Sequence, residues 1–128
     1  MTLILDAGGL SNLACDRAKL EELTRRGLWP AQVPAVVLTE ALTGDHRRDH
    51  HVNRLLRACQ VREVDEAQAR EAARLRTATH RAGTISAVDA VVAAVAGAQP
   101  EAVVLTSDPL DMRALAEHTT SPILVVDV

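Results

Sequence analysis

Short apolar runs alternate with longer amphipathic stretches along the whole chain, and this pattern predicts β-strands alternating with helices. We expect the strands at residues 3–5, 32–33, 61–64, 102–105 and 123–126. We expect the helices at about 11–26, 35–43, 45–59, 65–81, 86–96 and 109–117. Such alternation is typical of a parallel sheet covered by helices. The sequence therefore predicts an α/β fold in three layers, α/β/α, with a short parallel sheet of four to five strands in a single domain over residues 1–128.

Several expected elements are bounded by residues with special backbone or capping properties. Gly27 follows the first helix and is expected to end it. Asp65 and Gln68 have the spacing of a capping box at the start of helix 65–81, and Gly83 is expected to end that helix. Pro34 has no N–H group and is expected to stop the pairing of the second strand.

The composition fits a compact core of aliphatic side chains. Hydrophobic residues make up 48% of the 128 residues, but there is no Phe or Tyr and Trp29 is the single tryptophan. Leu, Val, Ile and Ala must therefore fill the core, which suits a buried parallel sheet. Cys15 and Cys59 form neither a disulfide framework nor a zinc pattern. The first apolar run is too short for a signal peptide or a membrane span, so we expect a cytoplasmic protein with no membrane partner.

The charge balance argues against indiscriminate binding to nucleic acids, because the formal net charge is −3. The same net charge is compatible with a nucleic-acid enzyme that has acidic residues clustered in its active site and basic residues around them. All basic residues except Lys19 are arginine, which suits bidentate phosphate contacts, although a GC-rich coding sequence gives the same bias. Arg47 and Arg48, followed by Arg54 and Arg57, form the best candidate patch for binding RNA phosphates. Surface salt bridges explain these four residues almost as well.

Four acids occupy positions where carboxylates are unusual. Asp6 directly follows the first strand, and Asp108 closely follows strand 102–105. Ligands of open parallel sheets bind beyond the carboxyl ends of such strands. Glu40 and Asp89 lie within strongly apolar helical stretches. An ionised carboxylate in apolar surroundings is costly unless something pairs with it.

Each of these acids also has a structural interpretation. Asp108 before Pro109 has the pattern of a helix N-cap with proline in the first helical position. Asp89 lies in a first helical turn, where the helix dipole favours acids. Glu40 can be a solvated helix residue, and Asp6 can cap the helix that follows it. The joint pattern, and no single member of it, favours a functional site.

Four carboxylates brought together would repel one another and raise each other's pKa, and a divalent cation would remove that repulsion. Ligands that offer only oxygen favour Mg²⁺ or Mn²⁺ over zinc. A cation of this kind can bind a phosphoryl oxygen and lower the pKa of an attacking water. The acids Asp6, Glu40, Asp89 and Asp108 therefore suit phosphodiester hydrolysis.

At these positions the sequence resembles the PIN-domain family of ribonucleases. The resemblance is carried, in order along nearly the full chain, by the segments LILDAGGL, VVLTEAL, SAVDAVVAA and VLTSDPLDM. It implies a PIN-like fold with catalytic, metal-binding acids at Asp6, Glu40, Asp89 and Asp108. Asp111, one helical turn further on, is an alternative to Asp108.

The resemblance also bears on residues beside the acids. Thr106 and Ser107 are similar to polar residues that the family places next to its last acid, and we expect them to bind substrate. The chain departs from the family at Gly8, where relatives often carry Ser, Thr or Asn. A side-chain contact to a bound water or phosphate would be missing there, unless the backbone N–H groups of Gly8 and Gly9 replace it.

The short chain resembles bacterial toxins of the VapC type. That likeness implies cleavage of RNA, a homodimer, and inhibition by a cognate VapB-type antitoxin that inserts a C-terminal segment, often with an arginine, into the acidic site. Mg²⁺ or Mn²⁺ would be the cofactor.

Other folds and functions also place an acid after the first strand or at the ends of parallel strands. A haloacid-dehalogenase-like phosphatase needs a second Asp at the position of Gly8, and a receiver domain needs a lysine after a late strand, whereas the only lysine is Lys19 in the first helix. The main alternative is a catalytically weak or inactive PIN-like module that binds RNA or a partner. A DNA-cleaving nuclease also remains open, because four acids do not distinguish the two sugars.

Overall fold

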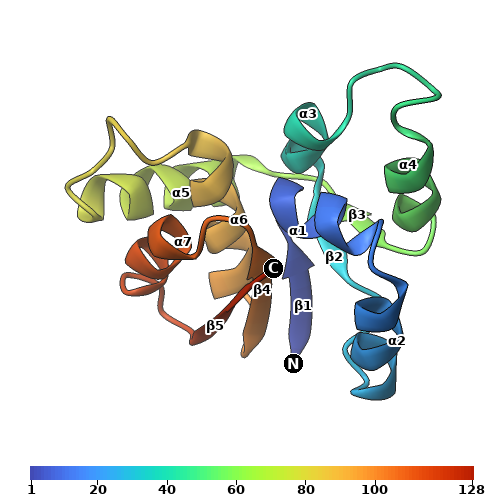
Figure 1. The fold of residues 1–128 in the computed structure, drawn as a ribbon. Helices are drawn as coiled ribbons and strands as arrows, with labels where there is room; N and C mark the ends of the chain where they lie inside the picture. Colours follow the sequence, from blue (N-terminus) through green and yellow to red (C-terminus); the bar gives the residue numbers. More distant parts are fainter.

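A computed structural model describes all 128 residues of the chain. Its centre is a five-stranded parallel sheet with strand order β3-β2-β1-β4-β5 (Figure 1). The strands are β1 (Thr2–Leu5), β2 (Gln32–Pro34), β3 (Gln60–Arg62), β4 (Ala102–Thr106) and β5 (Ile123–Asp127). The α-helices are α1 (Ala7–Leu13), α2 (Arg17–Arg25), α3 (Leu38–Ala41), α4 (His50–Leu56), α5 (Glu66–Ala78), α6 (Ala87–Gly97) and α7 (Pro109–Ala116), and the 3-10 helix η1 (Ala35–Val37) precedes α3. The predicted α/β class and parallel sheet are confirmed.

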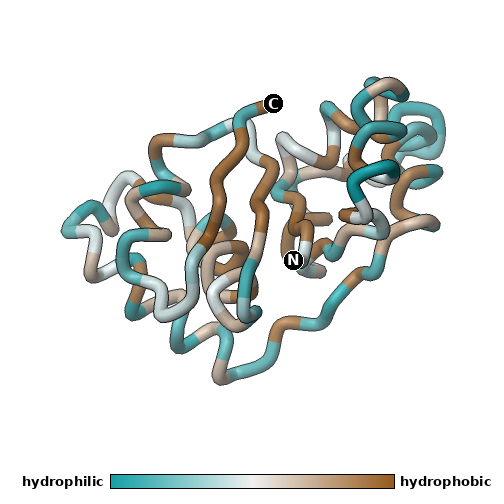
Figure 2. Tube along the Cα trace, turned by 90° about the horizontal axis from the view of Figure 1, so that it is seen from below, coloured by the Kyte–Doolittle hydropathy of each residue, from teal (hydrophilic) through white to brown (hydrophobic).

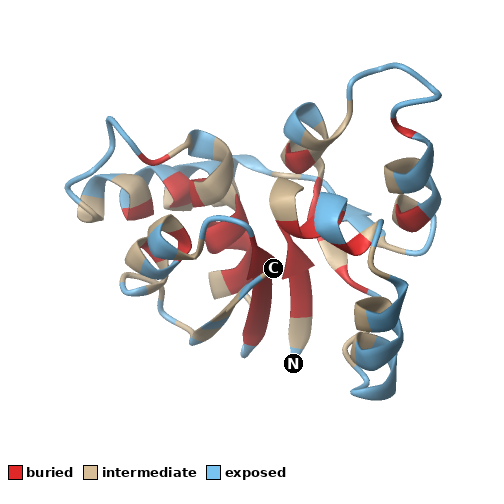
Figure 3. Ribbon diagram, in the orientation of Figure 1, coloured by how far each residue is buried: buried red, intermediate tan, exposed pale blue.

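The two central strands are the most buried part of the sheet. Every residue of β4 is buried, as are Leu3, Ile4 and Leu5 of β1 (Figure 3). Near-continuous apolar sequence is what a parallel strand needs when helices cover both of its faces. Hydrophobic residues accordingly concentrate in the central strands, and hydrophilic residues lie on the outer parts of the helices (Figure 2).

The helices form two groups. The first contains α2, α3 and α4, each of which packs against α1, and α1 itself lies on β1 and β4. The second contains α5, α6 and α7, which pack against one another, and α6 contacts β1, β2 and β4. Helix α6 is rich in alanine, so its backbone can approach the sheet closely, and six of its residues are buried. The core is thus built from aliphatic side chains, as the composition predicts.

The single helix predicted at 11–26 is wrong, because the structure has two helices there. The first ends at Leu13, and Asp16 begins the second by accepting a hydrogen bond from the Lys19 N–H at 3.0 Å. The end of the second helix agrees with the prediction, since Gly27 follows it with a φ of 73°. Glycine adopts this conformation without the steric cost that a Cβ brings.

The helix predicted at 45–59 begins later, at His50, because the preceding residues form a turn around Asp49. The Asp49 carboxylate is buried and accepts hydrogen bonds from the N–H groups of Thr43 and Gly44. These bonds fix the connection between α3 and α4. A side chain that closes a loop in this way competes with continuing the helix.

Two smaller expectations also need correction. Pro34 is the last residue of β2 and is in register with Arg62, so the strand includes Pro34 and its pairing ends there, one residue later than predicted. Helix α5 ends at Ala78, before Gly83, and His80 takes the positive φ of 57° after it. The capping box between Asp65 and Gln68 is confirmed.

None of the helices is long and apolar enough to cross a membrane.

Candidate functional site

The central strands β1 and β4 are neighbours, and the sheet extends from this pair in both directions. The strands β2 and β3 follow on the β1 side, and β5 follows on the β4 side, so the strand order switches between β1 and β4. Leu5 is in register with Leu105, so the residues that follow them, Asp6 and Thr106, are neighbours at the carboxyl ends of the two strands. A reversal of this kind leaves a crevice where α/β proteins bind ligands. Asp6 therefore lies at the centre of the candidate site.

Asp6 is only 3% exposed and lies between β1 and α1. Its Oδ1 accepts a hydrogen bond from the Gly9 N–H at 2.7 Å, and its Oδ2 accepts one from the Thr106 hydroxyl. Burial raises the pKa of Asp6, because it removes water from the charged form, while the bonds from Thr106 and Gly9 partly offset this effect. The carboxylate is thus held in one orientation.

Thr106 connects two of the predicted acids. Besides donating to Asp6, its Oγ1 accepts a hydrogen bond from the Asp108 N–H at 2.9 Å. The side chain is fully buried and its hydroxyl is already engaged. Thr106 thus holds Asp6 and the start of α7 in place, and substrate binding by Thr106 stays a prediction.

Gly8 and Ser107 share one small space beside Asp6. A Cβ at position 8 would lie 1.8 Å from the Ser107 Oγ and 2.4 Å from its Cβ. Because the Ser107 Cβ itself is too close, rotating the hydroxyl away cannot make room. Glycine at position 8 is therefore required by Ser107, and the exposed serine places a hydroxyl where a side chain of residue 8 would lie. Substrate binding by Ser107 stays a prediction.

Three more acids lie close together next to Gly8 and Ser107. Asp89, Asp108 and Asp111 each offer a carboxylate oxygen, and these oxygens lie within 4.8 Å of one another. Asp89 belongs to the first turn of α6, Asp108 is the N-cap of α7, and Asp111 lies in the first turn of α7. The N-cap interpretation of Asp108 is confirmed, since its side chain accepts a bond from the Asp111 N–H at 3.4 Å. Two helices thus begin at the same acidic cluster, and their dipoles favour negative charge there.

The charges of the acids act on one another across the site. Burial raises the pKa of Asp89 to about 6, a bond from Ser86 opposes this change, and the negative charges of Asp6, Asp108 and Glu40 raise the pKa further. The structure therefore brings all four predicted acids into one electrostatic neighbourhood. Glu40 is the most peripheral of them: it is exposed on α3 and is not part of the group of three.

The residues present fit a hard divalent cation. The cluster offers only carboxylate oxygens and two of its members are partly buried. Burial first, and then the neighbouring acids, raise the pKa of Asp89, so its ionised form is costly without a bound cation. Oxygen-only ligands with room for water suit Mg²⁺ or Mn²⁺. Asp89, Asp108 and Asp111 would hold such an ion, with Asp6 beside them. The alternative last acid, Asp111, stands together with Asp108 and does not replace it.

One cation of the chain itself touches the cluster. The Arg81 Nη2 lies 2.7 Å from the Asp111 Oδ1. The sequence gives only a slight hint of this contact, because the two residues are 30 positions apart and belong to no shared periodic pattern.

The arginines predicted to bind RNA lie elsewhere. Arg47 and Arg48 are exposed in the connection between α3 and α4. Their backbone N–H groups donate hydrogen bonds to the Asp45 Oδ1 at 2.8 and 3.3 Å. Neither side chain forms an ion pair with the acidic cluster. Their contact with substrate stays a prediction.

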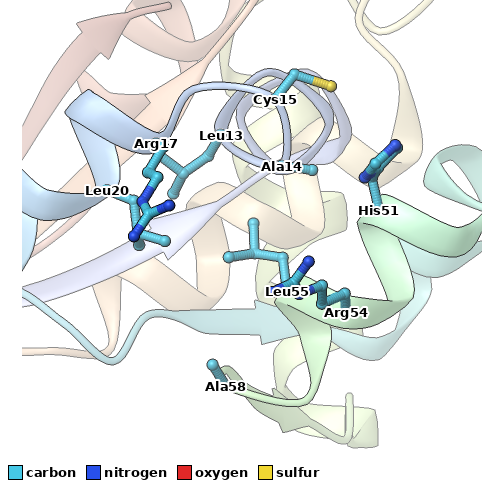
Figure 4. A pocket seen from close by; sticks show the side chains of 9 residues that line it. All are labelled: Leu13, Ala14, Cys15, Arg17, Leu20, His51, Arg54, Leu55 and Ala58. Atoms are coloured by element: carbon cyan, nitrogen blue, oxygen red, sulfur yellow. The ribbon is translucent and has the colours of Figure 1, made fainter.

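A cavity of about 710 Å³ lies between α1, α2 and α4, and its lining includes none of the clustered acids. Figure 4 shows its apolar residues with the two arginines and the histidine among them. Its lining consists of Leu13, Ala14, Cys15, Arg17, Leu20, His51, Arg54, Leu55 and Ala58. We call this cavity the α1–α4 groove.

Residues 4–117 match the PIN domain family. The chain belongs to this family. PIN domains are generally nucleases, and the acidic cluster at the β1–β4 switch point of this PIN domain is consistent with that activity. None of the curated proteins compared with this PIN domain matches its sequence.

Several solved structures share the fold of this PIN domain. The DNA-bound VapBC structure from Salmonella typhimurium superposes with a TM-score of 0.70 at 18% identity, over 99% of this chain and 98% of the other. PAE2754 from Pyrobaculum aerophilum gives a TM-score of 0.65 at 21% identity, over 100% and 84% of the two chains. FitAcB from Neisseria gonorrhoeae gives 0.64 at 18% identity, over 96% of each chain. At these identities the likeness establishes the fold.

Proposed function

We propose that this PIN domain is an endoribonuclease that depends on Mg²⁺ or Mn²⁺ and hydrolyses phosphodiester bonds of RNA. The observation that carries the proposal is the meeting of Asp89, Asp108 and Asp111 within 4.8 Å, beside the buried Asp6 at the end of β1. Acids that must be ionised together in partly apolar surroundings are expected where a cation is to be bound.

Each part of the site has a distinct task in this proposal. Asp6 keeps a fixed orientation through Gly9 and Thr106, and its oxygens retain lone pairs for a further ligand. Asp89, Asp108 and Asp111 hold the ion, and Glu40 adds negative charge at the edge of the site. A bound divalent cation supplies Lewis-acid polarisation of the phosphoryl group and lowers the pKa of the attacking water.

The experiment is cleavage of a panel of labelled RNAs, with Mg²⁺ or Mn²⁺ and with EDTA. We expect cleavage that EDTA abolishes and excess metal restores, and we expect Asp89→Asn and Asp6→Asn to remove it. Asp16→Asn is the matched control, because Asp16 is also a helix N-cap aspartate but begins α2, outside the acidic cluster.

Equal cleavage by the wild type and both site variants would reveal a contaminating nuclease. A folded wild type that binds RNA and never cuts it would support the inactive PIN-like module instead. Cleavage of DNA in place of RNA would assign the site to a deoxyribonuclease. Ser107 beside Gly8 weakens the argument for inactivity, because a hydroxyl is present in the space that Gly8 leaves open.

We also propose that the chain is the toxin of a toxin–antitoxin pair and acts in the cytoplasm as a homodimer. The structures that share its fold include VapBC and FitAcB. The α1–α4 groove supports a protein partner, because its apolar lining and its basic residues Arg17 and Arg54 suit an amphipathic helix with acidic residues. The partner would be a VapB-type antitoxin.

The antitoxin proposal is tested with the product of the neighbouring reading frame. We expect that protein to suppress RNA cleavage, and we expect Arg17→Glu in the groove to escape suppression while cleavage itself is retained. Arg25→Glu, at the exposed end of α2, is the control with the same charge change. A partner that inhibits the wild type and Arg17→Glu equally would exclude the groove. Light scattering of the purified chain tests the homodimer.

A further inference from the structure

The ion pair between Arg81 and Asp111 differs from every other ion pair of the chain. The other four join residues three or four positions apart on one helix, with both side chains widely exposed: Arg17–Glu21, Arg26–Glu22, Arg70–Glu66 and Arg74–Glu71. Pairs of that kind arise from helix spacing and contribute little stability. Arg81 instead reaches from the α5–α6 connection to a side chain that is only 15% exposed.

The backbone of Arg81 is fixed by local hydrogen bonds, whereas its side chain is held at one point. The carbonyl oxygen accepts bonds from the N–H groups of Thr84 and Ile85 at 2.9 and 3.0 Å, and the Arg81 N–H donates to the Thr79 Oγ1 at 3.1 Å. The side chain is 47% exposed, and the Asp111 carboxylate is its only hydrogen-bond acceptor in the chain. The other N–H donors of the planar guanidinium are therefore free to bind a second acceptor.

We infer that Arg81 binds a phosphate group of the RNA substrate, at the edge of the acidic cluster. The inference rests on the proposed function. Asp111 belongs to the cluster with Asp89 and Asp108, so its contact places the guanidinium directly beside the expected reaction site. RNA that approaches the acidic cluster, on a chain of net charge −3, meets repulsion, and a cation at this edge offsets it. The guanidinium fork matches phosphate oxygens, and Asp111 orients it.

The test measures binding of a fluorescently labelled, mixed-sequence single-stranded RNA to the whole chain, with Ca²⁺ in place of Mg²⁺ to prevent cleavage. Affinity is followed as a function of salt concentration. Loss of one phosphate contact makes the slope of log K against log salt shallower by about 0.7 for single strands. We expect this change, with a several-fold loss of affinity, for Arg81→Gln, and we expect Arg81→Lys to keep the wild-type slope.

Arg70→Gln is the matched control, because it removes the same charge from an exposed arginine of α5 that pairs only with Glu66. Its slope should equal that of the wild type. Thermal melting checks that Arg81→Gln folds, and the backbone bonds of residue 81 do not depend on its side chain. A wild-type slope in Arg81→Gln would overturn the inference, as would an equal change in Arg70→Gln. If the wild type itself shows no salt-dependent RNA binding, the proposed ribonuclease function fails as well.

Discussion

Thr106 donates its hydroxyl hydrogen to the Asp6 Oδ2, although the two residues are 100 positions apart in the sequence. The pairing of β1 with β4 brings them together, and the same hydroxyl oxygen accepts the Asp108 N–H. One buried threonine thus links the first acid of the chain to the helix that carries the last two. Changes at Thr106 should therefore affect the geometry and the charge of the site at the same time.

Replacing Thr106 with the isosteric valine should disturb both. We expect Thr106→Val to lose about 2 kcal/mol of stability, because the Asp108 N–H and the buried Asp6 each lose a partner. Since the hydroxyl lowers the pKa of Asp6, its removal should raise that pKa and move the onset of metal binding to higher pH. Urea unfolding and Mn²⁺ titrations over pH measure the two effects. Thr106→Ser, which keeps a hydroxyl, should stay close to the wild type, and equal losses in both variants would assign the effect to packing.

The raised pKa of Asp89 predicts how the stability of the metal-free chain depends on pH. Its pKa is 3.8 as a free group and about 6 in the folded chain, so folding favours the protonated form. The contribution of Asp89 to stability is therefore fully present below about pH 4 and is lost as the pH rises through about 6. In EDTA, Asp89→Asn should be more stable than the wild type above pH 7, by on the order of 1 kcal/mol once solvent screening is allowed for.

Urea unfolding at several pH values tests the direction of this pH dependence of stability. The advantage of Asp89→Asn should shrink as the pH falls toward about 4, because the wild-type carboxyl is then protonated in both states. Asp16→Asn, at a helix N-cap outside the acidic cluster, should show no such trend. A wild type more stable than Asp89→Asn at pH above 7 without metal would contradict the repulsion among the acids.

The positions of the main acids could be predicted from sequence because strand ends are a local signal. A buried apolar run followed by an acid places Asp6 and Asp108 at one edge of a parallel sheet, whatever the exact strand order. Asp89 stands out because apolar helix residues surround it. Helix capping is also a local signal, which is why the prediction of a capping box at the start of α5 was correct.

The features that sequence missed depend on contacts between distant segments. The burial of Thr106 and its two hydrogen bonds follow from the pairing of β1 with β4. The place of Arg81 before the Asp89 helix suggested that it could approach the site, but its partner Asp111 follows from the packing of α5, α6 and α7. The break between α1 and α2 had a local signal, the N-cap at Asp16, but leucines at helical spacing on both sides concealed it. The strand order itself has no signature in a single sequence.

Removing the charge of Arg81 should strengthen metal binding. The guanidinium lies 2.7 Å from a carboxylate of the cluster, so it repels a cation bound there and competes for Asp111. We expect Arg81→Gln to bind Mn²⁺ about threefold more tightly, as one charge near a partly solvated site implies. Isothermal titration measures the affinity without any RNA, and Arg70→Gln is again the control. Weaker Mn²⁺ binding in Arg81→Gln would show that Arg81 holds the cluster together.

The two cysteines should differ strongly in reactivity. Cys15 is exposed and lines the α1–α4 groove, whereas burial raises the pKa of the Cys59 thiol to about 11. The thiolate is the reactive form, so Cys59 should react slowly at neutral pH. Labelling with a chromogenic disulfide should show one fast thiol, which Cys15→Ser removes and Cys59→Ser leaves in place. A partner seated in the groove should slow the labelling of Cys15, and two equally fast thiols would contradict the burial of Cys59.

A serine introduced at position 8 should damage the protein. The new Cβ would lie 2.4 Å from the Ser107 Cβ, so the turn after β4 must shift. Overpacking of this kind costs about 1–3 kcal/mol, and the shift should also weaken Mn²⁺ binding through the adjacent Asp108. Adding Ser107→Gly to Gly8→Ser should restore most of the stability, because the hydroxyl then occupies the same space from the other segment. A double-mutant cycle by urea unfolding measures the coupling between the two positions. Additive losses would show that Gly8 and Ser107 do not compete for one space.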